Sequence, residues 1–406
     1  MQQTRPTLAA AAIAFAAAFL LCGYELVRSA ASTLFMEAYG KDALPIVMAI
    51  MPAGVLLMLY GYGRLLSWLG PRRTLLTSSL ISGAAILCCY TGIRAGWRPA
   101  AGILYVVREA YIVLLVEQYW SFLDSTLGHD RAKTLNGPIC GMGSMGAILG
   151  ASAVQHYATI LGTQTMLVFG AAAVIPAALC SDFAYRCAVE DSPTTDAAPK
   201  HPPSSGYLGL RLFREHRLLL ILLLIIVATQ AISTALDLNF NSLLADKIAG
   251  LDERTSYQGA FWRDVNICSA LAQFAVAPLV LRHLPLRLVH IVIPLVHTAA
   301  CANLLLHPSL ESAALAFLLF KVLDYSIFRS AKEILYIPFS FDVRYRAKEV
   351  IDVLGYRGSK GAISLAIAAL KNAPVLLSKG LYAGIAAGAA LVWLVLAVPL
   401  TRRAPE

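Results

Sequence analysis

The chain has 406 residues, of which 58% are hydrophobic and only 14% are charged, with a formal net charge of +9. Soluble globular domains carry about 25% charged residues, so this composition excludes a soluble protein and indicates an integral membrane protein. The positive charge does not indicate nucleic-acid binding, because no basic tract is interleaved with aromatic residues.

Apolar segments follow one another along the chain, with lengths close to the roughly 20 residues that a membrane-spanning helix needs. Their number and length favour helices over a β-barrel. The first segment begins like the apolar region of a signal peptide, but its helical pattern continues, so we expect a retained spanning helix. We predict twelve segments, at 8–35, 43–66, 74–94, 100–124, 136–158, 163–186, 216–245, 257–281, 287–306, 310–330, 348–371 and 376–400.

A hydrophilic stretch divides these segments into two sets of six. Residues 190–206 read EDSPTTDAAPKHPPSSG, and their Pro, Ser and Thr content predicts a flexible linker. We therefore predict an all-α membrane protein with a six-helix half over 1–189, a cytoplasmic linker over 190–215 and a second six-helix half over 216–406. This is the layout of a major-facilitator-type transporter, whose site lies between two such halves near the bilayer midplane.

Basic residues gather in alternate loops between the segments. Cytoplasmic loops are the ones enriched in Lys and Arg, so we expect both termini in the cytoplasm and the chain in an inner, cytoplasmic membrane. The turn around Arg64 loosely resembles the gate loop of major facilitators. The basic positions are Arg64, Arg72, Arg73, Arg131, Lys133, Arg186, Lys200, Arg211, Arg214, Arg217, Arg282, Arg287, Arg344 and Arg346.

Polar residues interrupt the first segment at Tyr24, Glu25 and Arg28. Glu25 and Arg28 are three residues apart and share a helix face, so they can neutralise each other across one turn. Alternatively, Arg28 faces a central cavity and binds an anion. Both interpretations are open from the residues, and Tyr24 is a candidate for stacking on a base.

Segments four and seven carry further buried charges. Glu109 and Glu117 are eight residues apart, about two helical turns, and lie on one face. An embedded carboxylate is a candidate proton carrier as well as a substrate ligand. The candidate proton carriers are Glu25, Glu109, Glu117 and Asp237. In segment five, small residues form a stripe that predicts close helix packing rather than binding: Gly141, Gly143, Gly146 and Gly150.

Many charged residues lie beside and inside an apolar segment in residues 330–361, SAKEILYIPFSFDVRYRAKEVIDVLGYRGSKG. A charge at the bilayer centre costs about 2.5–3.5 kcal/mol, so several of them need partners or a water-filled cavity. We predict a charged cytoplasmic loop at 342–346. Arg357 and Lys360, three residues apart, continue one helix face into the membrane.

This stretch resembles the ATP/ADP translocase (nucleotide transporter) family of plastids and obligate intracellular bacteria. The order KE-x-x-YIP, a basic loop and I-D-V-x-G-x-R-x-x-K-G carries the resemblance, and YELVRSAASTL in segment one parallels that family's first helix. The matching positions are Lys332, Glu333, Tyr336, Ile337, Pro338, Asp352, Gly355, Arg357 and Lys360.

The resemblance implies site residues in both halves, and we expect Arg28, Arg357 and Lys360 to converge on one cavity. The implied charge and gate network is Arg64, Arg131, Glu333 and Asp352. The implied substrate-binding residues are Tyr24, Arg28, Glu109, Trp120, Asp237, Asn241, Lys332, Arg357 and Lys360.

The chain departs from that family's pattern at two places. Ala31 and Ser32 stand where the family carries a Lys-Asp pair, and Asp237 and Asn241 stand where it has Glu and Lys. Two positive charges are therefore missing, which argues against assuming a triphosphate substrate.

Three functions stay open from the sequence. The leading interpretation is an ATP/ADP-exchange-like secondary transporter for a nucleotide or related phosphorylated anion, with the lipid bilayer and this small anion as its partners. The second is a proton-coupled carrier of another organic anion, and the third is a non-transporting membrane module. We expect no enzyme activity, cofactor or metal, because no G-x-x-x-x-G-K-[ST], catalytic array or metal-ligand spacing occurs.

Overall fold

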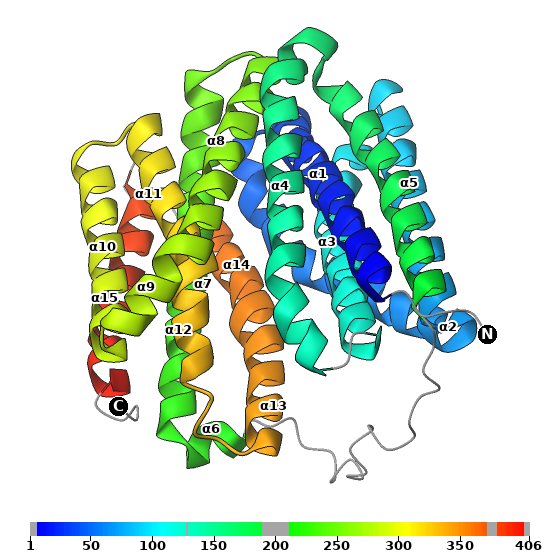
Figure 1. The fold of residues 1–406 in the computed structure, drawn as a ribbon. Helices are drawn as coiled ribbons and strands as arrows, with labels where there is room; N and C mark the ends of the chain where they lie inside the picture. The colour runs from blue at the N-terminus through cyan, green and yellow to red at the C-terminus, as the bar shows by residue number, and fades with distance from the viewer. Residues whose placement is uncertain (1–5, 127–128, 189–210, 372–379, 402–406) are drawn as a thin grey trace. The chain divides into compact units, whose positions relative to one another are not determined.

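The computed structural model describes residues 6–126, 129–188, 211–371 and 380–401, and these residues contain helices and turns but no strand (Figure 1). The elements are α1 (Pro6–Tyr39), η1 (Lys41–Ala43), α2 (Leu44–Arg94), α3 (Pro99–Thr126), α4 (His129–Leu161), α5 (Thr163–Cys187), α6 (Arg211–Glu215), α7 (Arg217–Lys247), α8 (Leu251–Leu271), η2 (Ala272–Val276), α9 (Ala277–His283), α10 (Leu286–Leu306), α11 (Leu310–Leu323), η3 (Asp324–Phe328), α12 (Arg329–Ile334), α13 (Phe341–Val350), η4 (Ile351–Gly358), α14 (Ser359–Lys371) and α15 (Leu381–Thr401).

All twelve predicted segments are helical where the structure describes them. Among the described residues, eight helical stretches are long and apolar enough to cross a membrane. One of these, Lys41–Arg94, has 54 residues and contains both segment two and segment three. The other three predicted segments correspond to α3, to α11 with η3 and α12, and to α13 with η4 and α14. Each of these three carries several charged residues.

Glycines in the left-handed region end or break two of the long helices. Gly40 follows α1 with φ 80°, and its N–H donates to the Met36 carbonyl at 2.8 Å, which terminates the Ala-rich helix. Gly70, with φ 73° and ψ 169°, interrupts α2 immediately before Pro71. A proline disfavours helical backbone at the residue before it, so this Gly-Pro pair separates the two spanning segments.

Chain contacts divide the protein into two compact units. Unit 1 comprises Met1–Gly40, Ala53–Pro202 and Ile248–Asn266, and unit 2 comprises Lys41–Pro52, Pro203–Lys247 and Ile267–Glu406. Each unit thus includes a short segment from the other half of the sequence. Helix α8 contributes residues to both units, with the change at Asn266.

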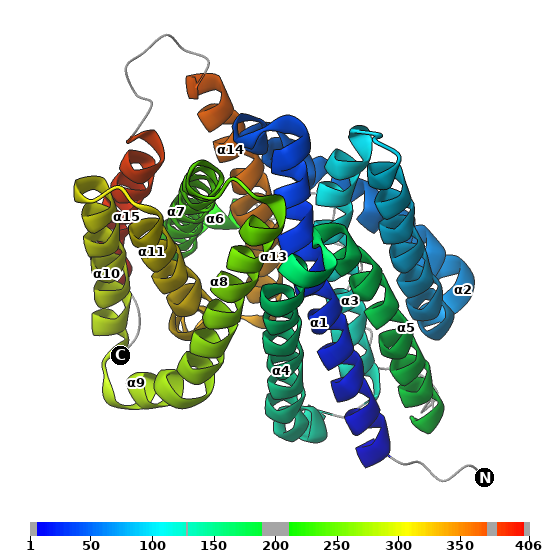
Figure 2. The ribbon, with the colours of Figure 1, turned by 90° about the horizontal axis from the view of Figure 1, so that it is seen from above.

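In unit 1, α1 runs beside α4 and α5 (Figure 2). A Cβ at Gly146 would lie 2.0 Å from the Ala18 carbonyl oxygen, and one at Gly150 would lie 2.3 Å from that of Cys22. The backbones of α4 and α1 therefore touch where the small-residue stripe was predicted, which confirms its role in packing.

In unit 2, α7 packs against α15, α11 and α14. The core between α10, α15 and η3 consists largely of rings. The His297 and Trp393 ring centroids are 5.3 Å apart, and those of Trp393 and Phe328 are 4.8 Å apart. Burial of such large rings provides much of the packing in a core of this kind.

Two predicted irregular segments are helical. The loop prediction at 342–346 is wrong, because α13 covers these residues; no Gly or Pro follows Pro338 until Gly355, and Arg, Ala, Lys and Glu favour helix. Within the predicted linker, α6 forms over Arg211–Glu215, where Nε of Arg211 donates to Glu215 at 2.7 Å, one turn away. Residues 189–210, which include most of this linker, lie outside the described part of the chain.

Candidate functional site

A polar cavity of about 360 Å³ lies within unit 2. Helix α7 and five helical elements that follow it in the sequence supply its walls. The lining residues are Gln230 and Ser233 of α7, Lys321 of α11, Asp324 and Tyr325 of η3, Arg329 and Lys332 of α12, Asp352 and Tyr356 of η4, and Lys360 of α14.

Helical spacing brings these side chains to the cavity from two chain segments. One face carries residues three or four apart, from Lys321 through Asp324 or Tyr325 to Arg329 and Lys332. The second face carries Asp352, Tyr356 and Lys360, each four residues after the last. These spacings are those of neighbours on one side of a helix.

Both segments become π-helical where they line the cavity, in η3 and η4. A π-helix makes i→i+5 hydrogen bonds and occurs frequently at functional sites. Its wider turn favours a spacing of four residues over three. This is why Tyr356 lines the cavity with Lys360, whereas Arg357, half-buried in η4, is not among the lining residues.

The two lysines of the α11–α12 face are held by neutral hydroxyl groups. Nζ of Lys321 donates to Oγ of Ser233 at 3.0 Å, and it lies 5.3 Å from the Tyr325 ring centroid. Nζ of Lys332 donates to the Tyr356 hydroxyl at 2.9 Å. These partners orient the ammonium groups without cancelling their charge.

The cavity carries more positive than negative charge. Its lining has four basic residues and two acidic ones, Asp324 and Asp352. Among the described residues, no ion pair of 4.0 Å or less joins any of these six side chains to an opposite charge. The charges act on one another at longer range: Asp324 interacts with Lys321, Lys332 and Arg329. Such a site suits a multiply charged anion.

Unit 1 contains a separate charged cluster around Arg28. Nη2 of Arg28 donates to both carboxylate oxygens of Glu25, at 2.8 and 2.6 Å. Nδ2 of Asn266 also donates to Glu25, at 3.0 Å, and the guanidinium lies 3.4 Å from the Trp262 ring centroid and 5.1 Å from that of Tyr24. The Glu25–Arg28 pair that the sequence left open is therefore formed.

A second arginine extends this cluster on α3. Nη1 of Arg108 donates to the Arg28 carbonyl at 2.9 Å and to Oγ of Ser32 at 2.5 Å. Its Nε lies 3.6 Å from Oε1 of Glu109. Ser32, which departs from the translocase pattern, thus binds an arginine of the same unit. The neighbouring Ala31, which also departs from it, is fully buried.

The other predicted site residues have local partners or lie outside the described part. Asn241 donates to its neighbour Asp237 on α7, at 2.8 Å to the side chain and 2.9 Å to the carbonyl. Exposed Glu333 pairs with Lys348, and exposed Arg64 lies 5.6 Å from the Trp68 ring centroid. The side chains of Glu117, Trp120 and Arg131 fall outside what the structure describes.

Of the predicted site residues, the structure thus brings Lys332, Asp352 and Lys360 to one cavity. Arg28 belongs to unit 1 and Lys360 to unit 2, so their convergence stays a prediction. The predicted set of site residues does not include part of the lining, although a signal existed: charges three residues apart inside an apolar segment indicate a functional site. The charged and aromatic lining residues outside that set are Lys321, Asp324, Tyr325, Arg329 and Tyr356.

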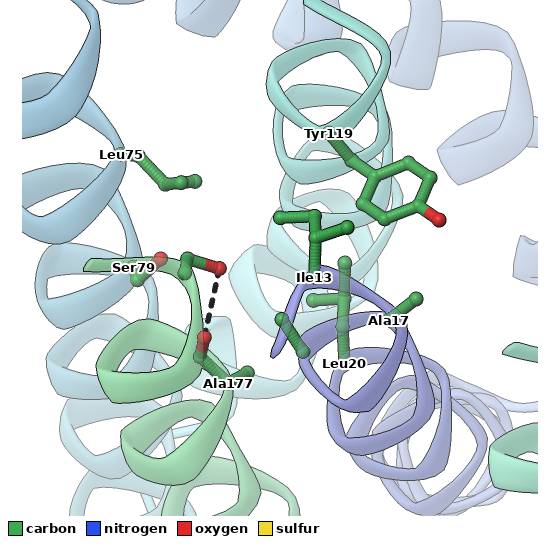
Figure 3. A pocket seen from close by; sticks show the side chains of 9 residues that line it. Ile13, Ala17, Leu20, Leu75, Ser79, Tyr119 and Ala177 are labelled. Atoms are coloured by element: carbon green, nitrogen blue, oxygen red, sulfur yellow. Dashed lines mark hydrogen bonds between the residues drawn. The ribbon is translucent and has the colours of Figure 1, made fainter. Parts of the chain in front are cut away.

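The described part of unit 1 offers a contrasting pocket (Figure 3). It has a volume of about 20 Å³ and is lined mainly by apolar side chains of α1, α2 and α5, including Ile13, Leu20 and Leu75. Within it, Oγ of Ser181 donates to the Ala177 carbonyl at 2.8 Å. This volume holds about one water molecule, so the pocket is a packing defect rather than a solute site.

The chain resembles solved structures of membrane transporters over nearly its whole length. An auto-inhibited POT family peptide transporter has a TM-score of 0.68 and 14% identity, covering 98% of both chains. The nucleoside transporter NupG has a TM-score of 0.69 and 11% identity, covering 97% of this chain and 98% of its own. The xylose transporter XylE from E. coli, in an inward open conformation, has a TM-score of 0.60 and 15% identity, covering 95% of both.

These likenesses confirm the predicted fold class, an all-α membrane protein with a major-facilitator-like fold. No family model matches the chain, and no curated protein matches it either. At such low identity the likeness concerns the fold, and one fold hosts many unrelated functions. The choice of a function therefore depends on the residues of the cavity.

Proposed function

We propose that this protein is a secondary transporter for a nucleotide or a related phosphorylated anion, working by alternating access in the manner of ATP/ADP exchange. One observation carries the proposal: Lys321, Arg329, Lys332 and Lys360 line a single cavity of unit 2. Two of them, Lys332 and Lys360, are also matching positions of the translocase pattern.

The chemistry of these side chains suits phosphate. A guanidinium binds phosphate oxygens through paired hydrogen bonds, and an ammonium acts as a compact point charge. Tyr325 and Tyr356 add aromatic surface beside the bases, on which a ring of the substrate can stack. The fold supports transport in general, because the solved structures that share it are peptide, nucleoside and xylose transporters.

The proposal includes the place of the protein in the cell. We expect an inner, cytoplasmic membrane with both termini in the cytoplasm, from the distribution of basic residues. We also expect transport without chemical conversion of the solute.

A second candidate is a proton-coupled carrier of another organic anion. The observation that favours it is the presence of two carboxylates, Asp324 and Asp352, inside the cavity. A carboxylate in a partly apolar site is a plausible proton carrier, as is Glu109 in unit 1.

Uptake into proteoliposomes tests the proposal. We expect labelled nucleoside phosphates or sugar phosphates to accumulate, faster when the vesicles contain unlabelled substrate, and unlabelled adenosine to compete poorly. Lys332→Gln should abolish this uptake, whereas Lys247→Gln, an exposed lysine paired with Glu311, should not. If no phosphorylated compound accumulates in vesicles containing folded protein, the proposal is wrong and the non-transporting membrane module becomes the better interpretation.

A further inference from the structure

The charge balance of the unit 2 cavity limits the charge of its ligand. Counted with the ordinary charges of their side chains, four basic residues (Lys321, Arg329, Lys332 and Lys360) and two acidic ones (Asp324 and Asp352) leave an excess of two positive charges. The neutral partners of Lys321 and Lys332, a serine and a tyrosine hydroxyl, do not reduce this excess.

The charged groups nearest to the lining leave this balance unchanged. Glu333 acts on Lys332 but is itself paired with Lys348 outside the lining. Asp237 acts on Lys321 and Arg357 acts on Asp352, so these two contribute one charge of each sign.

The four bases repel one another across the cavity, and an anion that balances their excess charge relieves this repulsion. A ligand with two negative charges balances the two excess positive charges of the lining without adding a net negative charge. A phosphate monoester carries about −1.5 to −2 at pH 7 and offers three acceptor oxygens. A carboxylate carries one charge only, and a diphosphate or triphosphate carries more than the cavity compensates.

We infer that the cavity selects a dianion, a phosphate monoester, and that Asp324 and Asp352 are the residues that set this limit. The inference rests on the proposed function. It narrows the substrate from phosphorylated anions in general to monophosphates and keeps exchange as the mode of transport. Without the two aspartates the same four bases would leave an excess of four positive charges, which suits a nucleoside triphosphate. The aspartates come from η3 and η4, so each of the two lining faces carries one of them.

Binding measurements on the purified full-length protein in nanodiscs test the inference. Two ligand series are used, and within each the scaffold is constant and the charge varies. The first is adenosine with its mono-, di- and triphosphate, and the second is fructose 6-phosphate with fructose 1,6-bisphosphate. We expect the monophosphate to bind most tightly in whichever series binds, and uncharged adenosine to bind weakly.

Variants then test the role of the two aspartates. Asp324→Asn and Asp352→Asn should each shift the ratio of monophosphate to diphosphate affinity toward the diphosphate, by about ten-fold, which is the effect of 1.4 kcal/mol. Lys360→Gln removes a positive charge, so it should shift the same ratio of affinities toward the monophosphate. Glu311→Gln removes an exposed charge that is paired with Lys247, and it should leave the ratio unchanged.

A ratio measured within one variant does not depend on the fraction of protein that folds, so loss of stability does not imitate these shifts. Tighter binding of the diphosphate or triphosphate by the unmodified protein would overturn the inference and leave the proposed function standing. So would an unchanged ratio in both aspartate variants. If no phosphorylated compound binds, both proposals fail.

Discussion

At the scale of single residues, the two charged clusters differ in how their cations are compensated. Arg28 is bound to the carboxylate of Glu25, with a second donor from Asn266, so its charge is balanced inside unit 1. Lys321 and Lys332 are bound to hydroxyl groups instead. A cation with a neutral partner keeps its attraction for an incoming anion, and for this reason we propose that the substrate site lies in unit 2.

Lys360→Ala tests this assignment directly. Binding of a phosphorylated ligand should weaken by about 1.5–3 kcal/mol, the contribution of a hydrogen bond to a charged group. Lys360→Arg should restore part of the affinity, because the charge returns with a different shape. Affinity and membrane yield are measured together: normal yield with unchanged affinity for every phosphorylated compound would remove Lys360 from the site.

The Glu25–Arg28 pair predicts a different pattern. Arg28→Gln leaves the carboxylate of Glu25, only 3% exposed, without its cation. Breaking such a buried pair costs about 3–5 kcal/mol. We expect low membrane yield and a lower melting temperature for Arg28→Gln, and recovery of both in the double variant Glu25→Gln/Arg28→Gln. A double variant as unstable as the single one would show that the pair is not what stabilises this cluster.

The sequence alone could identify some of these residues and not others. Lys332, Asp352 and Lys360 were found because they sit in the stretch that resembles the translocases. Lys321 and Asp324 lie in segment ten, outside that stretch, and only their i, i+3 spacing marks them. Whether Asp237 would face a substrate or bind Asn241 one turn away depends on rotamers that the surrounding packing decides.

At the scale of elements, long apolar runs of sequence predict the helices. They do not predict where a helix departs from regular α geometry. All twelve segments are helical where described, because an apolar run of this length has few other ways to satisfy its backbone in a membrane. The π-helices η3 and η4 have no comparable signal in composition. The helix over 342–346 was missed because its charges were taken as evidence of a loop.

The contact between α1 and α4 gives a prediction about packing. Gly146→Ala places a Cβ 2.0 Å from the Ala18 carbonyl oxygen, so the helices must separate, at a cost of about 1–3 kcal/mol. Gly388→Ala, at an exposed helical position of α15, meets nothing within 4 Å and removes a flexible glycine, so it should be neutral or slightly stabilising. Thermal unfolding in detergent compares the two variants; equal melting temperatures would contradict the close approach.

At the scale of the whole molecule, the fold is shared with transporters at 11–15% identity. Such distant sequences converge on one fold because apolar length and loop charge constrain a membrane protein more strongly than residue identity does. The solute is not constrained in this way, since it depends on a few side chains in the cavity.

The topology predicted from loop charge is open to a direct test. Reporters fused after Ser204 and at the C-terminus should both show activity typical of the cytoplasm, because basic residues flank these positions. A reporter in the turn between α10 and α11, near Pro308, serves as the control and should report the opposite side. A non-cytoplasmic signal at either of the first two sites would overturn the six-plus-six arrangement.

The mode of energy coupling separates the two transport candidates. In an exchanger, uptake into substrate-loaded vesicles should be unaffected when an uncoupler collapses the proton gradient. In a proton-coupled carrier that uses Glu109, the uncoupler should stop uptake, and Glu109→Gln should abolish gradient-driven uptake while counter-exchange continues. We expect the first result; the second would establish the proton-coupled alternative.

The π-helix η4 also bears on how the chain tolerates insertions and deletions. A helix with i→i+5 hydrogen bonds contains one residue more than an α-helix of the same course, so a single-residue deletion within Ile351–Gly358 can be absorbed by conversion to an α-helix. If the deleted residue lies between Asp352 and Lys360, the lysine becomes the seventh residue after Asp352, about two α-helical turns away, and stays on the same face of the helix. The wide turns of η4 therefore allow the loss of one codon without turning Lys360 away from the cavity.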